Sequence, residues 1–120
     1  MTKRFASILL AGVIIYLFLD SDITLAKTGY AVHYSDKFQG RKTANGEIFD
    51  QSDLTAAHNE FRYGTLVKVT NLENNYSIVV KINDRMAPHH SNIIDVTKRA
   101  AAKLGFINKG RARVSLEAIK

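Results

Sequence analysis

Residues 76–85 have the sequence Tyr-Ser-Ile-Val-Val-Lys-Ile-Asn-Asp-Arg. Successive side chains of a strand point to opposite faces, so a strand over Tyr76–Asn83 places three aliphatic side chains on one face: Ile78, Val80 and Ile82. This apolar strand runs directly into Asn83-Asp84-Arg85. Because a sheet holds the ends of its strands still, the polar residues here are well placed to act on a ligand.

Three further segments alternate in the same way and are predicted to be strands: Gly29–Tyr34, Thr65–Asn71 and Arg111–Ala118. In the last two of these segments, the residues expected to point inward are Val67, Val69, Ala112, Val114 and Leu116. The dipeptide Asn74-Asn75 is typical of a turn, and it leads from one predicted strand into the next.

A short helix is predicted over Lys98–Leu104, which is rich in alanine. Thr97 is suited to cap the start of this helix, and Gly105 suits the left-handed position that ends many helices. Many short strands with one short helix favour a mostly β fold, namely a compact β-barrel. The periodicity leaves the order of the strands open.

The first 26 residues differ in character from the rest of the chain. Two basic residues precede an apolar run of 15 residues from Phe5 to Leu19, and Thr24-Leu25-Ala26 follows. This run is shorter than the roughly 20 residues that a membrane-spanning helix needs. The pattern therefore predicts a signal peptide over residues 1–26, cleaved near Ala26, with an uncleaved membrane anchor as the alternative. Residues 27–120 then form a single domain.

Composition narrows the classes of partner and of chemistry. The chain has 120 residues, a formal net charge of +6 and no cysteine. The missing cysteine excludes a disulfide scaffold, a thiolate metal site, a cysteine nucleophile and a cysteine-linked lipid anchor. A basic surface favours a polyanionic partner. For an exported protein we expect an anionic cell-wall polymer rather than nucleic acid, and a location in the periplasm or cell envelope.

Strand and helix patterns leave three polar stretches unexplained: Gly40–Glu47, Leu54–His58 and Val79–Arg85. Each stretch has a purely structural interpretation. Glu47 is then a solvated loop carboxylate and His58 a core histidine, while Asp84 and Arg85 form an ion pair at a strand end. Three such coincidences in one small barrel point instead to a shared site.

These stretches carry a resemblance to a known family. From Gly29 to about Ile119 the chain is similar to the rare lipoprotein A family in the order and spacing of GYAVHY, GRKTANGE, LTAAH, YGTLVKVTNLENN, VVKINDR, IIDVTKRAAAKLG and RVSLEAI. The resemblance implies a six-stranded double-psi β-barrel. It also implies an endolytic lytic transglycosylase, which cuts the glycan strands of peptidoglycan and prefers strands without stem peptides.

Motif by motif, the resemblance implies catalytic roles for three residues, Glu47, His58 and Asp84. We expect substrate contacts from four other side chains: Tyr34, Asn45, Arg85 and Asp95. Phe38 and Phe49 join Tyr34 as candidates for stacking on sugars, and at least one of these three aromatic rings is expected to lie in the core.

The implied reaction needs a proton for the leaving oxygen of the β-1,4 bond between N-acetylmuramic acid and N-acetylglucosamine. The 6-hydroxyl of the muramic acid closes a 1,6-anhydro ring, so no water is consumed. Asp84 is the predicted acid and base, because the apolar strand before it favours a protonated carboxyl group. Arg85 is expected to turn away from Asp84, towards Asp95. Glu47 either stabilises positive charge at the anomeric carbon or shares the acid role, and His58 binds a carboxylate or the substrate.

The sequence leaves other functions open. The loop Met86–Asn92 lacks the glycine and the arginine that the family usually has there, which changes the substrate groove on that side. The main alternative is a non-catalytic, expansin-like barrel that binds the cell wall, and an inverting glycoside hydrolase is the third possibility. The histidines lack a zinc-binding spacing, so neither a metal nor a cofactor is expected. We expect a monomer whose partner is the peptidoglycan glycan strand.

Overall fold

Six β-strands and one α-helix form the part of the chain that the computed structural model describes, residues 26–119. The strands are β1 (Lys27–His33), β2 (Thr55–Ala57), β3 (Leu66–Asn71), β4 (Ser77–Asp84), β5 (Ile94–Val96) and β6 (Arg111–Ile119), and the helix is α2 (Lys98–Leu104). A short 3₁₀ helix, η1, spans Asp36–Phe38. Apart from Ala26, the predicted signal peptide lies outside the described residues.

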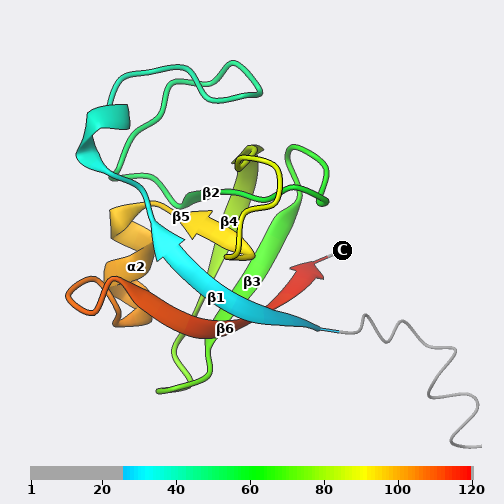
Figure 1. The fold of residues 1–120 in the computed structure, drawn as a ribbon, viewed down its shortest axis with the longest axis vertical. Helices are drawn as coiled ribbons and strands as arrows, with labels where there is room; N and C mark the ends of the chain where they lie inside the picture. Colours follow the sequence, from blue (N-terminus) through cyan, green and yellow to red (C-terminus); the bar gives the residue numbers. More distant parts are fainter. Residues whose placement is uncertain (1–25, 120) are drawn as a thin grey trace, which may run out of the picture.

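The strands close into a barrel in the order β1-β5-β2-β4-β3-β6, and β6 pairs with β1 to complete it (Figure 1). β1 runs parallel to β5 and β2 runs parallel to β4, whereas the other neighbours are antiparallel. This is the six-stranded, mostly β double-psi barrel that the resemblance implied. The parallel pairs join strands that are distant in sequence, which is why periodicity alone left the order open.

Small and branched aliphatic side chains fill the barrel interior. The residues predicted to point inward on β3 and β6 are all buried: Val67, Val69, Ala112, Val114 and Leu116. On β4, Val80 and Ile82 are buried, and Ile78 packs against them from a partly buried position. Burying one such aliphatic side chain contributes about 1.5–3 kcal/mol. The interior therefore makes the barrel wall a rigid support for the residues at its surface.

The sequence patterns did not predict β2 and β5 as strands. Each has three residues, too few to show an alternation, and all three residues of β2 are buried. Their importance lies in the register, because Ala57 of β2 lies opposite both Asp84 of β4 and Asp95 of β5. These two short strands therefore bring two acidic residues into one region of the wall.

Helix α2 packs against the barrel core and has both predicted caps. Thr97 Oγ1 accepts a hydrogen bond from the backbone N–H of Ala100, and Gly105 has a φ of 80°. A β-carbon at Gly105 would approach Asn74 Nδ2 to 2.7 Å. Both the backbone angle and the close neighbour therefore require glycine at the end of the helix.

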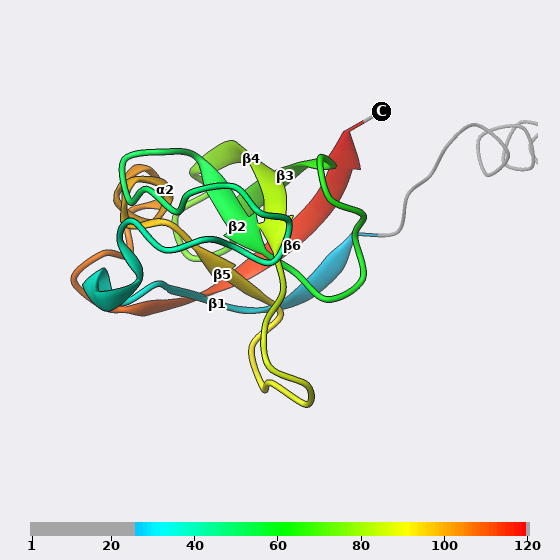
Figure 2. The same ribbon diagram turned by 90° about the horizontal axis from the view of Figure 1, so that it is seen from above.

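Two loops flank the wall around Asp84. Residues 35–54 connect β1 to β2, and residues 85–93 project from the barrel between β4 and β5 (Figures 1 and 2). The second loop includes His89, whose φ of 61° is uncommon for a residue with a side chain. Among residues 26–119, no helix is both long and apolar enough to span a membrane.

Candidate active site

Asp84 and Asp95 lie on either side of Ala57 in the barrel wall. The register of β2 and β4 shifts after Ala56, which places Asp84 instead of Asn83 opposite Ala57. A bulge of this kind re-aims the side chains that follow it. Two strand spacings separate the aspartates, or about 10 Å between their Cα atoms. Both side chains line the same cavity, with Ala57 between them.

The Asp84 carboxylate accepts three hydrogen bonds. Tyr34 Oη donates to Oδ2 at 2.6 Å. The backbone N–H groups of Ala44 and Arg85 donate to Oδ1 at 2.8 and 2.9 Å. The bond from Ala44 ties the loop of residues 35–54 to the end of β4. Oδ2 accepts only one of the three bonds, so one of its lone pairs is available to a substrate.

Tyr34 is buried beside this carboxylate, with 6% of its surface exposed. Its ring packs against Phe49, with centroids 4.3 Å apart, and meets Phe38 edge-on. Burial, followed by the hydrogen bond to Asp84, raises the pKa of the Tyr34 hydroxyl, which keeps this group a donor. Tyr34 and Phe49 are thus buried in one cluster, as expected for at least one of the three rings. Tyr34 also lines the cavity, and its contact with a sugar stays a prediction.

Asp95 has different surroundings: it is partly buried on the cavity face of β5, while its neighbours Ile94 and Val96 point into the barrel core. Its Oδ1 atom is buried and has no hydrogen-bond partner in the described part of the chain. Burial, together with the nearby charge of Asp84, raises the pKa of Asp95 to about 7. Asp95 is therefore a carboxyl group that can hold a proton close to neutral pH.

The cavity at the two aspartates has a volume of about 270 Å³ and is completed by Tyr34, Phe38, Ala57, Arg85, Met86, Ala87 and His90. Phe38 is the exposed aromatic ring of this group, with 36% of its surface accessible. Lys37 and Arg41 lie 5.2 and 5.9 Å from the centre of its ring. Phe38 thus offers an apolar contact with positive charge beside it, and stacking on a sugar stays a prediction for this residue.

Arg85 is held by groups other than the two carboxyl groups. Its Nη1 donates to the backbone carbonyl of His58 at 2.8 Å and to that of Asp84 at 3.3 Å. Its guanidinium lies 4.0 Å from the centre of the Tyr63 ring. As predicted, Arg85 turns away from the Asp84 carboxylate. The predicted direction towards Asp95 is wrong, because the His58 carbonyl and the Tyr63 ring hold the guanidinium elsewhere.

Glu47 lies in the loop of residues 35–54 and does not line the cavity of the two aspartates. Asn45 Nδ2 donates to its Oε1 at 2.6 Å, and Lys81 Nζ lies 2.9 Å from its Oε2. These partners, Asn45 before Lys81, lower the pKa of the exposed Glu47 carboxyl group. Glu47 is thereby an anion at neutral pH. Of its two predicted roles, this favours stabilisation of positive charge over donation of a proton.

Asn45 serves the loop that carries Glu47. Its Oδ1 accepts hydrogen bonds from the Thr43 hydroxyl at 2.7 Å and from the Glu47 N–H at 3.0 Å. Both lone pairs of that oxygen are therefore used within the protein. The side chain of Asn45 positions Glu47. For the predicted contact with the substrate, only the second N–H of the Asn45 amide is available.

His58 is buried, with 4% of its surface exposed. Its Nδ1 accepts hydrogen bonds from the backbone N–H groups of Glu60 and Phe61 at 3.0 and 3.1 Å. Burial, aided by the charges of Lys27 and Arg85, lowers the pKa of His58 to about 4. At neutral pH the ring is neutral, with its proton on Nε2. Within the described residues the His58 ring forms hydrogen bonds to backbone N–H groups and none to a carboxylate. The other predicted role, contact with the substrate, stays a prediction.

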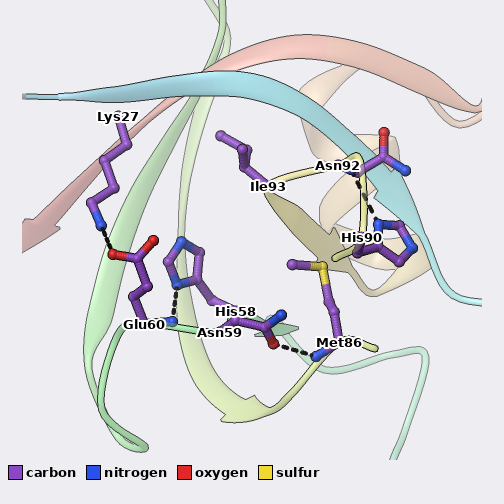
Figure 3. Close-up of a pocket in the computed structure, with 8 residues that line it drawn as sticks. All are labelled: Lys27, His58, Asn59, Glu60, Met86, His90, Asn92 and Ile93. Carbon is purple, nitrogen blue, oxygen red and sulfur yellow. Dashed lines mark hydrogen bonds and ion pairs between the residues drawn. The ribbon is translucent and has the colours of Figure 1, made fainter. Parts of the chain in front are cut away.

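A second cavity of about 190 Å³ adjoins the first and shares two residues with it, Met86 and His90. Figure 3 shows the His58 ring at this cavity, with Nδ1 bonded to the Glu60 backbone and the other ring nitrogen facing the Lys27–Glu60 ion pair. The shared residues belong to the loop Met86–Asn92. The loop that departs from the family pattern therefore forms the boundary between the two cavities.

Sequence reasoning missed the pairing of Asp84 with Asp95. Asp95 was predicted only as a substrate contact, and nothing singled out Ala57 between the two carboxyl groups. The signal in the sequence is Ile94-Asp95-Val96, a carboxyl group between two aliphatic residues, which is unusual for a buried strand. Within residues 26–119, no group of three or more His, Cys, Asp or Glu residues is placed to hold a metal ion.

Residues 26–116 match the model of a protein family described as lytic transglycolase. The chain belongs to the lytic transglycolase family. The match covers β1 to β5 and most of β6, and it includes every candidate site residue.

Curated relatives confirm the resemblance to the rare lipoprotein A family. The endolytic peptidoglycan transglycosylase RlpA of Neisseria meningitidis serogroup A is 47% identical over 93 residues, which are 78% of this chain and 39% of the relative. The protein of the same name from Rickettsia bellii is 45% identical over 97 residues, which are 78% of this chain and 43% of the relative. The chain thus spans less than half the length of these relatives.

Among solved structures, the expansin of Clavibacter michiganensis is similar to this chain. The TM-score is 0.63 at 21% sequence identity, and the likeness covers 80% of this chain and 51% of the expansin. At this identity the likeness concerns the fold alone.

Proposed function

We propose that the protein is an endolytic peptidoglycan lytic transglycosylase. It cleaves the β-1,4 bond between N-acetylmuramic acid and N-acetylglucosamine within glycan strands, preferably strands without stem peptides, and leaves 1,6-anhydro ends. The observation that carries the proposal is the pair of carboxyl groups, Asp84 and Asp95, on the wall of one cavity in a member of the lytic transglycolase family. The names of the curated relatives support the same reaction.

The chemistry requires two proton transfers. The leaving oxygen of the glycosidic bond takes up a proton while positive charge develops at the anomeric carbon. The attacking group is the 6-hydroxyl of the same muramic acid, and its proton must be removed. One donor and one acceptor are therefore needed at the scissile bond, and the wall provides two carboxyl groups. Glu47 is a third, more distant negative charge.

The adjoining cavities support a substrate longer than one sugar. A glycan strand lying across both cavities passes Phe38 and the two aspartates in the first and the Nε2 side of His58 in the second. The loop Met86–Asn92 then contacts the strand near its middle. Such a path favours cleavage within a strand, because the strand continues on both sides of the scissile bond.

The proposal includes export. Residues 1–26 serve as a signal peptide, and residues 27–120 act as a monomer in the periplasm or cell envelope, where peptidoglycan lies. The net charge of +6 supports attraction to anionic wall polymers. N-terminal sequencing of the exported protein tests this part. A start at or near Lys27 is expected, and an intact Met1 in a membrane fraction contradicts it.

Mass spectrometry of digested glycan strands tests the activity. Purified strands without stem peptides are incubated with the protein and with the Asp84→Asn variant as the control. New 1,6-anhydro ends with the wild type alone are the expected result. Reducing ends indicate an inverting hydrolase, and intact strands that co-sediment with the protein indicate an expansin-like binder. Either of these two results overturns the proposal.

A further inference from the structure

We infer that Asp95, not Asp84, holds the proton in the resting protein and delivers it to the leaving oxygen of the glycosidic bond. The inference rests on the proposed function and divides its two proton transfers between two residues. It replaces the expectation from sequence that Asp84 performs both. Three observations carry it: the hydrogen bonds of Asp84, the surroundings of Asp95, and the register that sets both residues beside Ala57.

Asp84 has the partners of an anion. Its oxygens accept bonds from one hydroxyl and two backbone N–H groups, those of Ala44 and Arg85. Backbone N–H groups can donate but cannot accept a hydrogen bond. The free lone pair on Oδ2 lets Asp84 act as the base of the second transfer, in which a carboxylate takes up the proton of the sugar 6-hydroxyl.

Asp95 lacks such donors. Its Oδ1 is buried without a hydrogen-bond partner in the described residues, and the side chain lines the cavity next to Asp84. Burying an unpaired carboxylate costs far more free energy than burying the neutral carboxylic acid. Burial and the charge of Asp84 raise the pKa of Asp95 to about 7. The environments of the two aspartates therefore separate an acid from a base.

The titratable and charged groups around the cavity agree with this division: Tyr34, Asp84, Arg85 and His90. The Tyr34 hydroxyl is committed to Asp84, and Arg85 donates to backbone carbonyls. His90 Nδ1 accepts a hydrogen bond from the backbone of Asn92. Within the described residues, no cation forms an ion pair with Asp95.

The two transfers balance without water. Asp95 gives its proton to the glycosidic oxygen as the bond from that oxygen to the anomeric carbon breaks. Asp84 takes the proton from the 6-hydroxyl as its oxygen bonds to the same carbon. Asp84 is then a carboxylic acid and Asp95 a carboxylate. Passage of one proton from Asp84 to Asp95 restores the resting state, so each turnover neither gains nor releases a proton.

Titration by carbon-13 NMR tests the inference without a substrate. The carboxyl carbon of Asp95 is followed from pH 3 to pH 9 in the wild type, in Asp84→Asn and in Glu47→Gln as the matched control. The expected midpoint for Asp95 in the wild type is about 7. Asp84→Asn should move the midpoint to lower pH because a negative neighbour is removed, and Glu47→Gln should leave it in place.

An Asp95 midpoint near the ordinary aspartate value of about 3.9 in the wild type overturns the inference. So does an Asp95 midpoint that stays unchanged in a folded Asp84→Asn protein. The wild-type midpoint decides the matter even where Asp84→Asn fails to fold. Absence of strand cleavage is a separate result, because it contradicts the proposed function while the titration reads Asp95 directly.

Discussion

Carboxyl groups lie both in the barrel wall, at Asp84 and Asp95, and in the loop that carries Glu47. The two regions differ in how far they expose these groups to solvent. The wall sets its two aspartates on β4 and β5, on either side of β2, and both are partly buried and line one cavity. The loop sets Glu47 in the open, beside Lys81 and Asn45. Burial raises the pKa of Asp95 to about 7, whereas hydrogen bonding lowers the pKa of Glu47.

In the mechanism that we propose, proton transfer and charge stabilisation therefore belong to different parts of the molecule. A group that donates a proton near neutral pH needs a setting that disfavours its anion, which burial and the charge of Asp84 provide for Asp95. A group that only stabilises positive charge needs to stay ionised, which Lys81 and Asn45 ensure for Glu47. Substitutions in the two regions should therefore have unequal effects.

The largest expected effect is the loss of turnover in the wall variants. Asp95→Asn and Asp84→Asn each remove one proton transfer, and general acid or base catalysis contributes about 10²–10⁴-fold. We expect a loss of kcat in this range for each variant, measured as anhydro ends formed per minute. Asp53→Asn, at an exposed aspartate outside both cavities, is the matched control. Residual activity of either wall variant above a tenth of the wild type contradicts the account.

The difference in stability between Asp95→Asn and the wild type should depend on pH in a defined direction. The pKa of Asp95 rises from 3.8 to about 7 on folding, so the wild type loses stability as the pH rises through that window. The full shift corresponds to on the order of 4 kcal/mol. Asn does not titrate, so in urea unfolding the variant should gain stability relative to the wild type as the pH rises from about 4 to about 7. A pH-independent difference between the two proteins would show that Asp95 does not titrate in this range.

Tyr34→Phe should have a smaller effect, because it removes one of three bonds to Asp84. A hydrogen bond to a charged group contributes about 1.5–3 kcal/mol, which corresponds to roughly a tenfold to hundredfold change in rate. We expect this loss in kcat with little change in KM, since the ring and its contact with Phe49 are kept. An unchanged kcat in folded Tyr34→Phe would show that the hydrogen bond from Tyr34 to Asp84 does not contribute to turnover.

The smallest expected effect is that of Glu47→Gln. Glu47 lies outside the cavity and its charge is partly offset by Lys81. We expect less than about a tenfold loss of kcat, and no change in the pH profile of kcat/KM, because an exposed charge acts weakly at a distance. A loss of kcat in Glu47→Gln as large as that in Asp95→Asn would indicate that Glu47 donates the proton, which contradicts the roles proposed for the two regions.

The sequence predicted the parts of the fold with local signals. Strands β1, β3, β4 and β6 alternate clearly, and helix α2 carries both caps, so each was predicted close to its observed bounds. β2 and β5 have three residues each and depend on their neighbours in the barrel. Their pairing is set by long-range contacts that no periodicity records.

The candidate site was predictable to the same extent. Asp84 follows an apolar strand and could be singled out, and the altered loop Met86–Asn92 was visible as a departure from the family pattern. The pairing of Asp84 with Asp95 required the order β4-β2-β5. The ion pair of Glu47 with Lys81 joins residues 34 positions apart. The pKa values of these carboxyl groups depend on burial and ion pairs between residues far apart in the chain. The sequence does not reveal such contacts, so it predicted Asp84 as the acid, whereas the structure leads us to propose Asp95.

Turnover with a leaving group that needs no proton tests the division of roles most directly. Glycan strands that end in a 2,4-dinitrophenyl β-glycoside of N-acetylmuramic acid release dinitrophenolate without acid assistance, whereas natural strands do not. The account predicts that Asp95→Asn cleaves this substrate within about tenfold of the wild type while it loses about a hundredfold or more on natural strands. Asp84→Asn should be impaired on both, because the 6-hydroxyl still has to lose its proton. Rescue of Asp84→Asn with no rescue of Asp95→Asn would contradict the account.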